Sequence, residues 1–123
     1  AMMVDPRDDS LWVGHLHGLS RFDGERWTTL TVADGLIYDR VFSLALDRDG
    51  GLWVGTDEGL SYLLDGRWSS YTTADGLASD TVFVIFIDRD GCVWFGDGYS
   101  TDGAAAVGVA GAVLIAAFFG GIA

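Results

Sequence analysis

Short apolar runs that end in the same polar turn recur along the chain. Val41–Leu46 and Val82–Ile87 are rich in residues that favour strands, and each is followed by Asp-Arg-Asp-Gly. A continuous apolar run of this length, bounded by turn residues, is typical of a strand that is covered on both faces. The Asp-Gly pair favours a tight hairpin, because glycine adopts positive φ at little cost. The pattern predicts that each run is the first strand of a hairpin.

The segment after Val41–Leu46 predicts three further strands. They are Leu52–Thr56, Leu60–Leu64 and Arg67–Thr72, separated by short turns rich in Asp and Gly. Residues 73–80 then cross to the next apolar run. Because strands joined by tight turns pair antiparallel, residues 41–72 predict one four-stranded antiparallel sheet.

This sheet is one copy of an internal repeat. Trp12, Trp53 and Trp94 are 41 residues apart, and residues 11–51 match residues 52–92 at 21 of 41 positions without a gap. A period near 40 residues with recurrent aromatic and glycine positions is typical of four-stranded β-propeller blades. The repeat therefore predicts stacked blades and not a single continuous sheet.

We predict a mainly β fold of tandem four-stranded antiparallel blades that make up an incomplete propeller, followed by a hydrophobic helix. The blade region is 1–96, with blades at about 2–31 and 41–72 and a partial blade at 81–96; residues 97–103 are a linker and 104–123 a hydrophobic C-terminal segment.

The C-terminal segment predicts a membrane anchor. Its twenty residues carry no charge, and a helix of that length would be roughly 30 Å long, about one hydrocarbon thickness. Small residues at intervals of four would let a second helix approach closely, and larger apolar residues would face lipid. The residues expected in the membrane are Ala104, Gly108, Ala112, Leu114, Ile115, Ala116, Phe118 and Phe119. Two alternatives stay open: a buried or oligomer-forming segment, and the product of a truncated or frameshifted propeller gene.

The repeated motifs resemble the two-component regulator propeller repeat. They are Leu52-Trp53-Val54-Gly55-Thr56, Gly59-Leu60-Ser61, Arg67-Trp68, Ala74-Asp75-Gly76-Leu77, and Val82-Phe83 with the later Asp88-Arg89-Asp90-Gly91. The resemblance implies an extracytoplasmic sensor domain of a hybrid histidine kinase or related regulator, in which many blades close into a ring that binds ligands, often carbohydrates. A transmembrane helix follows such domains. This chain departs from the family pattern because it has two to three blades, and because the motif stops after Gly96.

The net charge and the residue motifs argue against several classes of function. The net charge is −11, with 18 acidic and 7 basic residues, which argues against nucleic-acid binding, since a phosphate backbone requires clustered Lys or Arg. The single cysteine, Cys92, excludes an intrachain disulfide and is expected to be a small buried side chain. A catalytic acid and base need different environments that give their two carboxyl groups different pKa values. The carboxylates of this chain lie in repeated turns, which are expected to give them similar environments. We therefore expect no enzyme activity and no cofactor.

Two groups of polar residues are weak metal candidates. His15 and His17 lie two residues apart at a turn, but no third ligand accompanies them. The Asp-x-Asp-Gly turns resemble the start of a calcium loop but lack its remaining ligands; they contain Asp47, Asp49, Asp88 and Asp90. In both cases an ordinary turn is the favoured interpretation.

The tryptophans are the candidate interaction residues. Trp12, Trp53 and Trp94 repeat with the blade and are expected to pack between blades, with stacking on a sugar as the weaker alternative. Trp27 and Trp68 begin outer strands, where partial exposure is expected.

A short stack of blades leaves two open apolar flanks, because one blade cannot bury its faces alone. We therefore expect docking to a protein partner or self-association. The first hypothesis for function is a non-catalytic, membrane-anchored interaction module that docks on a partner or a larger membrane complex. The alternative is a fragment of an extracytoplasmic sensor propeller that binds a small ligand, possibly a carbohydrate, in two-component signal transduction. Either function places the blades in the periplasm or otherwise outside the cytoplasm.

Overall fold

The computed structural model describes residues 1–75, 81–89, 92–96 and 105–108, which form three antiparallel sheets. The first blade contains β1 (Met2–Val4), β2 (Leu11–His15), β3 (Gly18–Phe22) and β4 (Trp27–Leu30). The second contains β5 (Val41–Leu46), β6 (Leu52–Thr56), β7 (Gly59–Leu64) and β8 (Arg67–Tyr71). The third contains β9 (Val84–Ile87), β10 (Cys92–Gly96) and β11 (Ala105–Gly108). The prediction of a mainly β fold of propeller-like blades is confirmed.

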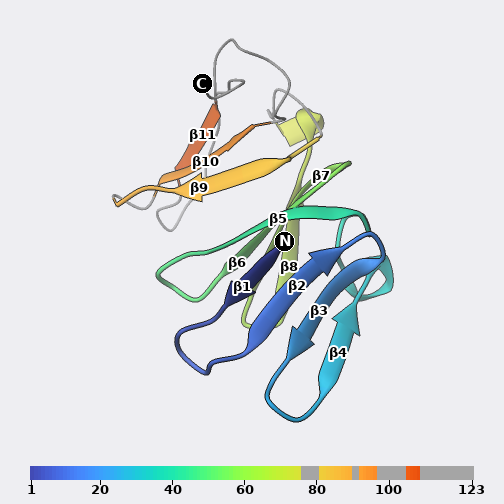
Figure 1. Cartoon of the computed structure of the whole chain (residues 1–123). Helices are drawn as coiled ribbons and strands as arrows, with labels where there is room; N and C mark the ends of the chain where they lie inside the picture. Colours follow the sequence, from blue (N-terminus) through green and yellow to red (C-terminus); the bar gives the residue numbers. More distant parts are fainter. Residues whose placement is uncertain (76–80, 90–91, 97–104, 109–123) are drawn as a thin grey trace.

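Within the first two blades the strands follow one another in sequence order, as the turns predict. Figure 1 shows the blades side by side, with the second between the first and the third; β5 adjoins both β2 and β9. The turn between β7 and β8 shows why the chain reverses so sharply there. Asp65 and Gly66 both have positive φ, at 50° and 80°, as a two-residue hairpin of the type that matches strand twist requires.

Short 3₁₀ helices in the two crossings between blades are a feature that the sequence analysis missed. They are η1 (Val32–Asp34) and η2 (Thr73–Asp75). Thr31 and Asp34 form a reciprocal capping box at η1: the Thr31 hydroxyl accepts from the Ala33 N–H at 3.2 Å, and the Asp34 carboxylate accepts from the Thr31 N–H at 2.9 Å. The same two bonds recur at Thr72 and Asp75.

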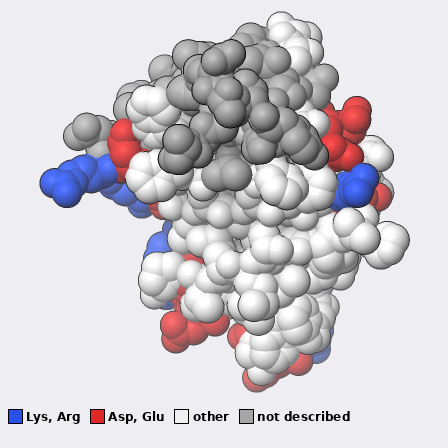
Figure 2. Space-filling model, turned by 45° about the horizontal axis from the view of Figure 1, so that its top comes forward, with Lys and Arg blue, Asp and Glu red and all other residues white. Residues whose placement is uncertain are grey.

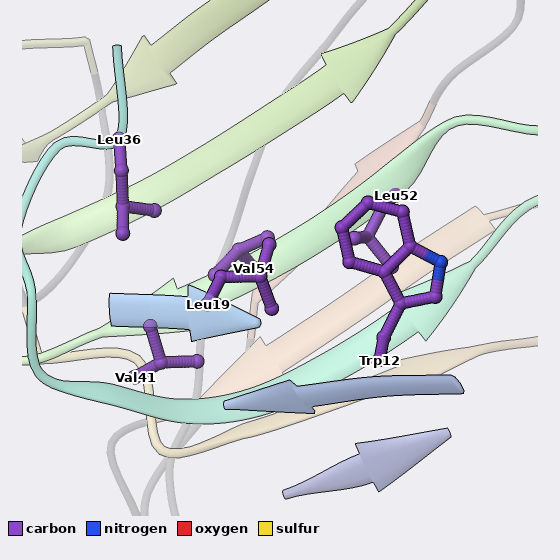
Figure 3. Close-up of a cluster of buried hydrophobic side chains, with 6 residues drawn as sticks. All are labelled: Trp12, Leu19, Leu36, Val41, Leu52 and Val54. Carbon is purple, nitrogen blue, oxygen red and sulfur yellow. The ribbon is translucent and has the colours of Figure 1, made fainter. Parts of the chain in front are cut away.

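Two apolar clusters hold the blades together. The first joins the first and second blades and is drawn in Figure 3; its buried members are Trp12, Leu19, Leu36, Val41, Leu52 and Val54. The second joins the second and third blades, with buried Trp53, Leu60, Val82, Val93 and Phe95. In each case a tryptophan from the second strand and a leucine from the third strand of one blade pack on the first two strands of the next blade or the residues just before them. The core therefore lies between sheets, as the repeat predicts.

The third blade extends further than predicted, and the helix expected over 104–123 is wrong at its start. Ala105–Gly108 form β11, which pairs antiparallel with β10 in the register Phe95↔Ala105 to Cys92↔Gly108. The backbone N–H and C=O groups of an apolar segment can be paired in a helix, but they can equally be paired with the edge strand of a sheet. The remaining residues of the predicted anchor, 109–123, and Ala104 lie outside the described residues. Among the residues that the structure describes, no helix is long and apolar enough to cross a membrane.

Candidate functional site

The three repeated tryptophans occupy equivalent positions but differ in exposure. Trp12 and Trp53 are buried between blades, with Trp53 only 1% exposed, whereas Trp94 is 38% exposed on the third blade. Trp53 also contacts the ring of Tyr62, with centroids 4.2 Å apart. Two of the three tryptophans thus lie between blades in this chain, and the third lies on the side of the third blade that faces away from the second.

The Asp47 carboxylate ties the turn before β6 to the tryptophan that follows. One oxygen, Oδ1, accepts from the backbone N–H groups of Asp49 at 3.0 Å and Gly51 at 2.8 Å. The other, Oδ2, accepts from Trp53 Nε1 at 3.3 Å and from the Tyr62 hydroxyl at 2.6 Å. Burial, and next the bond to this carboxylate, raise the pKa of Tyr62 above its ordinary range. Both oxygens of this calcium candidate therefore serve structural hydrogen bonds.

The equivalent aspartate of the third blade repeats part of this arrangement. Trp94 Nε1 donates to Asp88 Oδ2 at 2.9 Å. Asp49 is exposed in the second-blade turn, and Asp90 lies outside the described residues.

The two histidines lie near each other without further metal ligands. His15 Nε2 is 2.9 Å from the Ser20 hydroxyl, and His15 Nδ1 accepts from the His17 backbone N–H at 3.1 Å. Their rings are 6.5 Å apart. In the described part of the chain no three His, Cys, Asp or Glu side chains gather as a metal site would need.

An open recess of about 300 Å³ lies between the first and second blades, next to Trp12. Two arginines cross it: Arg21 stacks over the Trp12 ring at 5.6 Å and binds Asp8 at 2.9 Å, and Arg7 binds Asp5 at 3.0 Å. Hydrogen bonds from Ser10, more than the pairing with Arg21, lower the pKa of Asp8 to about 2. The side-chain bond from Arg7 lowers the pKa of Asp5. Four charged side chains of this recess are therefore paired as Asp5 with Arg7 and Asp8 with Arg21, and Asp65 adds a further carboxylate to its lining.

The first blade presents an apolar face to solvent, on the side away from the second blade. β1 and β2 pair as Met2↔Val13, Met3↔Trp12 and Val4↔Leu11. Because directly opposite residues point to the same side and neighbours alternate, Met3 faces the second blade together with Trp12. Its neighbours in β1 point outward, with Met2 72% and Val4 56% exposed.

The outer two strands extend this face. Leu11 pairs with Phe22, and Phe22 pairs with Trp27. The rings of Phe22 and Trp27 are 4.9 Å apart, and Trp27 is 56% exposed, as its place on an outer strand predicts. We call this surface the first-blade outer face, and its residues are Met2, Val4, Leu11, Val13, Phe22 and Trp27.

The same pattern is buried in the second blade. The face of the second blade that packs on the first blade has an apolar residue at each equivalent register position: Leu44, Leu46, Leu52, Val54, Leu63 and Trp68. Trp68, predicted to be partly exposed, is half-buried and packs against this cluster. The first-blade outer face thus has the pattern of a surface that elsewhere in the chain accepts a blade.

The third blade exposes the side that carries the repeated tryptophan, which in the first and second blades packs on the next blade. Phe86 pairs directly with Trp94 and is 60% exposed. Ala45 and Met3 hold the same position opposite Trp53 and Trp12. We call the surface made by Phe86 and Trp94 the third-blade outer face.

In the view of Figure 2 the described residues below the grey region are mostly uncharged, and Asp, Glu and Arg side chains lie around the margin. The sequence analysis expected open apolar flanks, and of the residues of the first-blade outer face it named only Trp27 as a candidate interaction residue. The available signal was the run of three apolar residues Met2, Met3 and Val4, because a strand places such residues on both of its sides.

Solved structures with a similar fold include sensor domains. The extracellular domain of the hybrid two component system BT3049 from B. thetaiotaomicron matches with a TM-score of 0.73 at 21% identity, over 86% of this chain and 15% of that one. The extracellular domain of BT4673 from the same organism, described as a hybrid two component system, matches with a TM-score of 0.76 at 16% identity, over 99% of this chain and 18% of that one. This chain therefore spans less than a fifth of those proteins.

Virginiamycin B lyase from Staphylococcus aureus also shares the fold, with a TM-score of 0.69 at 14% identity, over 88% of this chain and 37% of the lyase. Blades of this kind therefore occur in an enzyme as well as in sensor domains, so that the fold alone does not decide the activity. Among curated proteins, none matches the sequence of this chain.

The sequence itself matches a family model in two places. The model describes the two component regulator propeller, and it matches residues 35–58 and 76–99. Each match begins in a crossing between blades and ends just after the Leu-Trp-Val-Gly or Val-Trp-Phe-Gly strand. These two segments of the chain are therefore similar to the repeat of the two component regulator propeller.

Proposed function

We propose that the chain is a non-catalytic propeller module of an extracytoplasmic sensor. We propose further that it binds a partner by packing its first-blade outer face against the flank of another blade, which we call sideways binding. One observation carries the proposal: the first-blade outer face repeats, position by position, the apolar pattern that the second blade buries. A contiguous apolar face of this kind is an expected docking site.

The hydrogen bonds and ion pairs of three aspartates support a structural role for these carboxylates. Asp47 accepts four hydrogen bonds within its own blade. Asp5 and Asp8 are paired with Arg7 and Arg21. A catalytic carboxylate would need an oxygen directed at a substrate, and these oxygens are directed at turns, rings and arginines.

Photo-crosslinking tests the docking face. A benzophenone amino acid at Trp27, on the first-blade outer face, should give one product of defined mass in cells that make the chain. Peptide mass spectrometry of that product should place the crosslink on the flank of a propeller blade. The same amino acid at Glu25, exposed in the adjacent turn, is the control and should give none. Equal labelling from both positions would contradict a specific docking face.

Membrane attachment is a second part of the proposal. Residues 109–123 follow β11 and contain no charged residue, and the similar B. thetaiotaomicron structures are extracellular domains of signalling systems. Fractionation of the full chain and of a chain that stops after Gly108 should find only the first with membranes. Equal distribution of the two would contradict attachment through this segment.

Binding of a small ligand is the second candidate function, favoured by the same likeness to sensor domains. The recess between the first two blades offers one aromatic ring, that of Trp12, and the carboxylate of Asp65, while Asp5 and Asp8 are paired with Arg7 and Arg21. A thermal shift on addition of mono- and disaccharides would support this function, and unchanged melting across the series would contradict it.

A further inference from the structure

We propose that the recess between the first and second blades binds a small zwitterion with an apolar body, namely a free amino acid with an aliphatic side chain. The inference goes beyond the proposed function, because it does not depend on sideways binding and assigns the recess to a class of ligand other than a saccharide. The volume of the recess, about 300 Å³, lies at the lower end of the range of pockets that hold small organic molecules.

The equivalent position in the second blade is filled by the chain itself. Trp53 Nε1 and the Tyr62 hydroxyl both donate to Asp47 Oδ2, at 3.3 and 2.6 Å. The ring of Tyr62 also lies over Gly51, where a Cβ would be 1.9 Å from the hydroxyl oxygen. The indole N–H of Trp53 therefore has an acceptor within its own blade.

In the first blade the indole N–H has no such acceptor. Arg21 takes the register position that a tyrosine holds in the second blade, but its guanidinium binds Asp8 at 2.9 Å. Both oxygens of Asp5, which begins the turn, accept from Arg7. Among the residues that the structure describes, none accepts a hydrogen bond from Trp12 Nε1. This donor is therefore available to a ligand.

The indole N–H of Trp12 is also accessible from the recess. Trp12 lines the recess, and Figure 3 shows its indole nitrogen on the side of the ring away from Leu36 and Val41. In the described part of the chain, the Ser43 hydroxyl is the one buried side-chain polar atom without a hydrogen-bond partner. The unpaired N–H of Trp12 is therefore not closed off from solvent, and an oxygen atom of a ligand can accept from it.

The charged groups around the recess favour a ligand that carries both charges. Arg21 uses Nη2 for Asp8, and a guanidinium has five N–H donors, so others remain for a ligand carboxylate. Asp65 lines the recess and pairs with no described residue through a hydrogen bond or ion pair, so it can bind a ligand ammonium group. Three carboxylates and two guanidinium groups line the recess. A ligand with negative charge alone would therefore be repelled.

Apolar side chains line the rest of the recess and favour an aliphatic group. They are Leu46, Leu52 and Leu63, and burial of a ligand side chain against them is favourable. A saccharide that stacks on an aromatic ring needs an open ring face. Trp12 offers little, because it is only 9% exposed and Arg21 lies over its ring as a cation–π partner.

Isothermal titration calorimetry of the full chain with L-leucine tests the class of ligand. We expect one site per chain. Leucinamide lacks the carboxylate and N-acetyl-leucine lacks the ammonium group, so each should bind at least about tenfold more weakly, because each leaves a charged group of the recess unpaired. Equal binding of the three compounds would overturn the zwitterion as the ligand.

Two variants test the residues that hold the ligand. Trp12→Phe keeps an aromatic ring but removes the N–H. Asp65→Asn removes the charge at an exposed turn position, where asparagine tolerates the positive φ of 50°. Each should raise the dissociation constant for L-leucine at least about tenfold.

Asp49→Asn is the matched control, because Asp49 is an exposed turn aspartate that does not line the recess. It should bind L-leucine as the wild-type chain does. The exposed position of Asp65 keeps the test valid if Trp12→Phe fails to fold. Unchanged binding by Asp65→Asn, with an unchanged melting temperature, would overturn the assignment of the recess.

The remaining outcomes distinguish the inference from the proposed functions. A thermal shift with saccharides without binding of L-leucine would overturn the inference and support the second candidate function. Absence of both would overturn the inference together with that candidate. Neither result bears on sideways binding, which the Trp27 crosslink tests separately.

Discussion

Asp47 shows how one side chain connects a turn to the packing between blades. Its two oxygens accept bonds from two backbone N–H groups, an indole and a phenol. The sequence predicted the turn, since Asp-x-Asp-Gly is a local signal. It did not predict the bonds to Trp53 and Tyr62, because these depend on the pairing of β6 with β7.

Loss of the Asp47 carboxylate should destabilise the second blade strongly. Asp47→Ala leaves half-buried donors without an acceptor, and we expect the free energy of unfolding to fall by about 2–4 kcal/mol. Denaturant unfolding followed by tryptophan fluorescence measures this. Asp49→Ala, in the same turn but exposed, should change it by less than about 0.5 kcal/mol. Equal losses would mean that both carboxylates act together, as in an ion site.

Acid should destabilise the chain through the aspartates of the first blade. The pKa of Asp8 in the folded chain is about 2, and that of Asp5 is also lowered. Between about pH 2 and 4 the unfolded chain therefore binds more protons than the folded chain. The stability that these two carboxylates contribute is present above about pH 4 and is lost as the pH falls toward 2. Melting temperatures from pH 2 to 6 should fall less steeply for Asp8→Asn than for the wild-type chain. Parallel curves would contradict this assignment.

At the scale of elements, the strands were more predictable than the crossings and the end of the third blade. β5 and β6 have the predicted bounds, because apolar runs and Asp-Gly turns are local. The 3₁₀ helices were missed, although Thr31-Val32-Ala33-Asp34 is a short capping signal. β11 was missed because an apolar Ala-Ala-Val-Gly run has no helical or strand period of its own, and the edge of β10 decides its structure.

The capping box gives a test at this scale. Asp34→Ala removes the acceptor for the Thr31 N–H, so that we expect a loss of about 1 kcal/mol in the free energy of unfolding. Asp34→Asn keeps a side-chain oxygen that accepts the same bond and should recover most of the loss. Chemical denaturation of the two variants compares them, and an Asn variant as unstable as the Ala variant would show that charge and not capping matters.

At the scale of the whole molecule, the blades should unfold together. Their apolar cores lie between sheets, so no blade keeps its core without a neighbour. Leu19→Ala and Leu60→Ala truncate equivalent leucines at the two interfaces, and each should lower the free energy of unfolding by about 2–5 kcal/mol. Circular dichroism and fluorescence should report one coincident transition for both variants. Separate transitions would show that the interfaces are independent.

The stacking of blades was predictable from the repeat, but the outer face of the first blade was not. A shift of 41 residues aligns Val4 with Ala45, which lies opposite Trp53 and faces the third blade. In the structure Met3 takes that place opposite Trp12. The turn between β1 and β2 is one residue longer than its counterpart, and Asp9 within it has a φ of 61°.

That extra residue decides the sidedness of β1. Side chains alternate along a strand, so a shift of one residue exchanges the two sides of the whole strand. Deleting one residue between β1 and β2 would turn Met3 toward water and Met2 and Val4 toward the interior. The length of this loop therefore matters in addition to the hydrogen bonds that Asp5, Asp8 and Ser10 make within it. A single insertion or deletion would change which surface the protein presents to its surroundings.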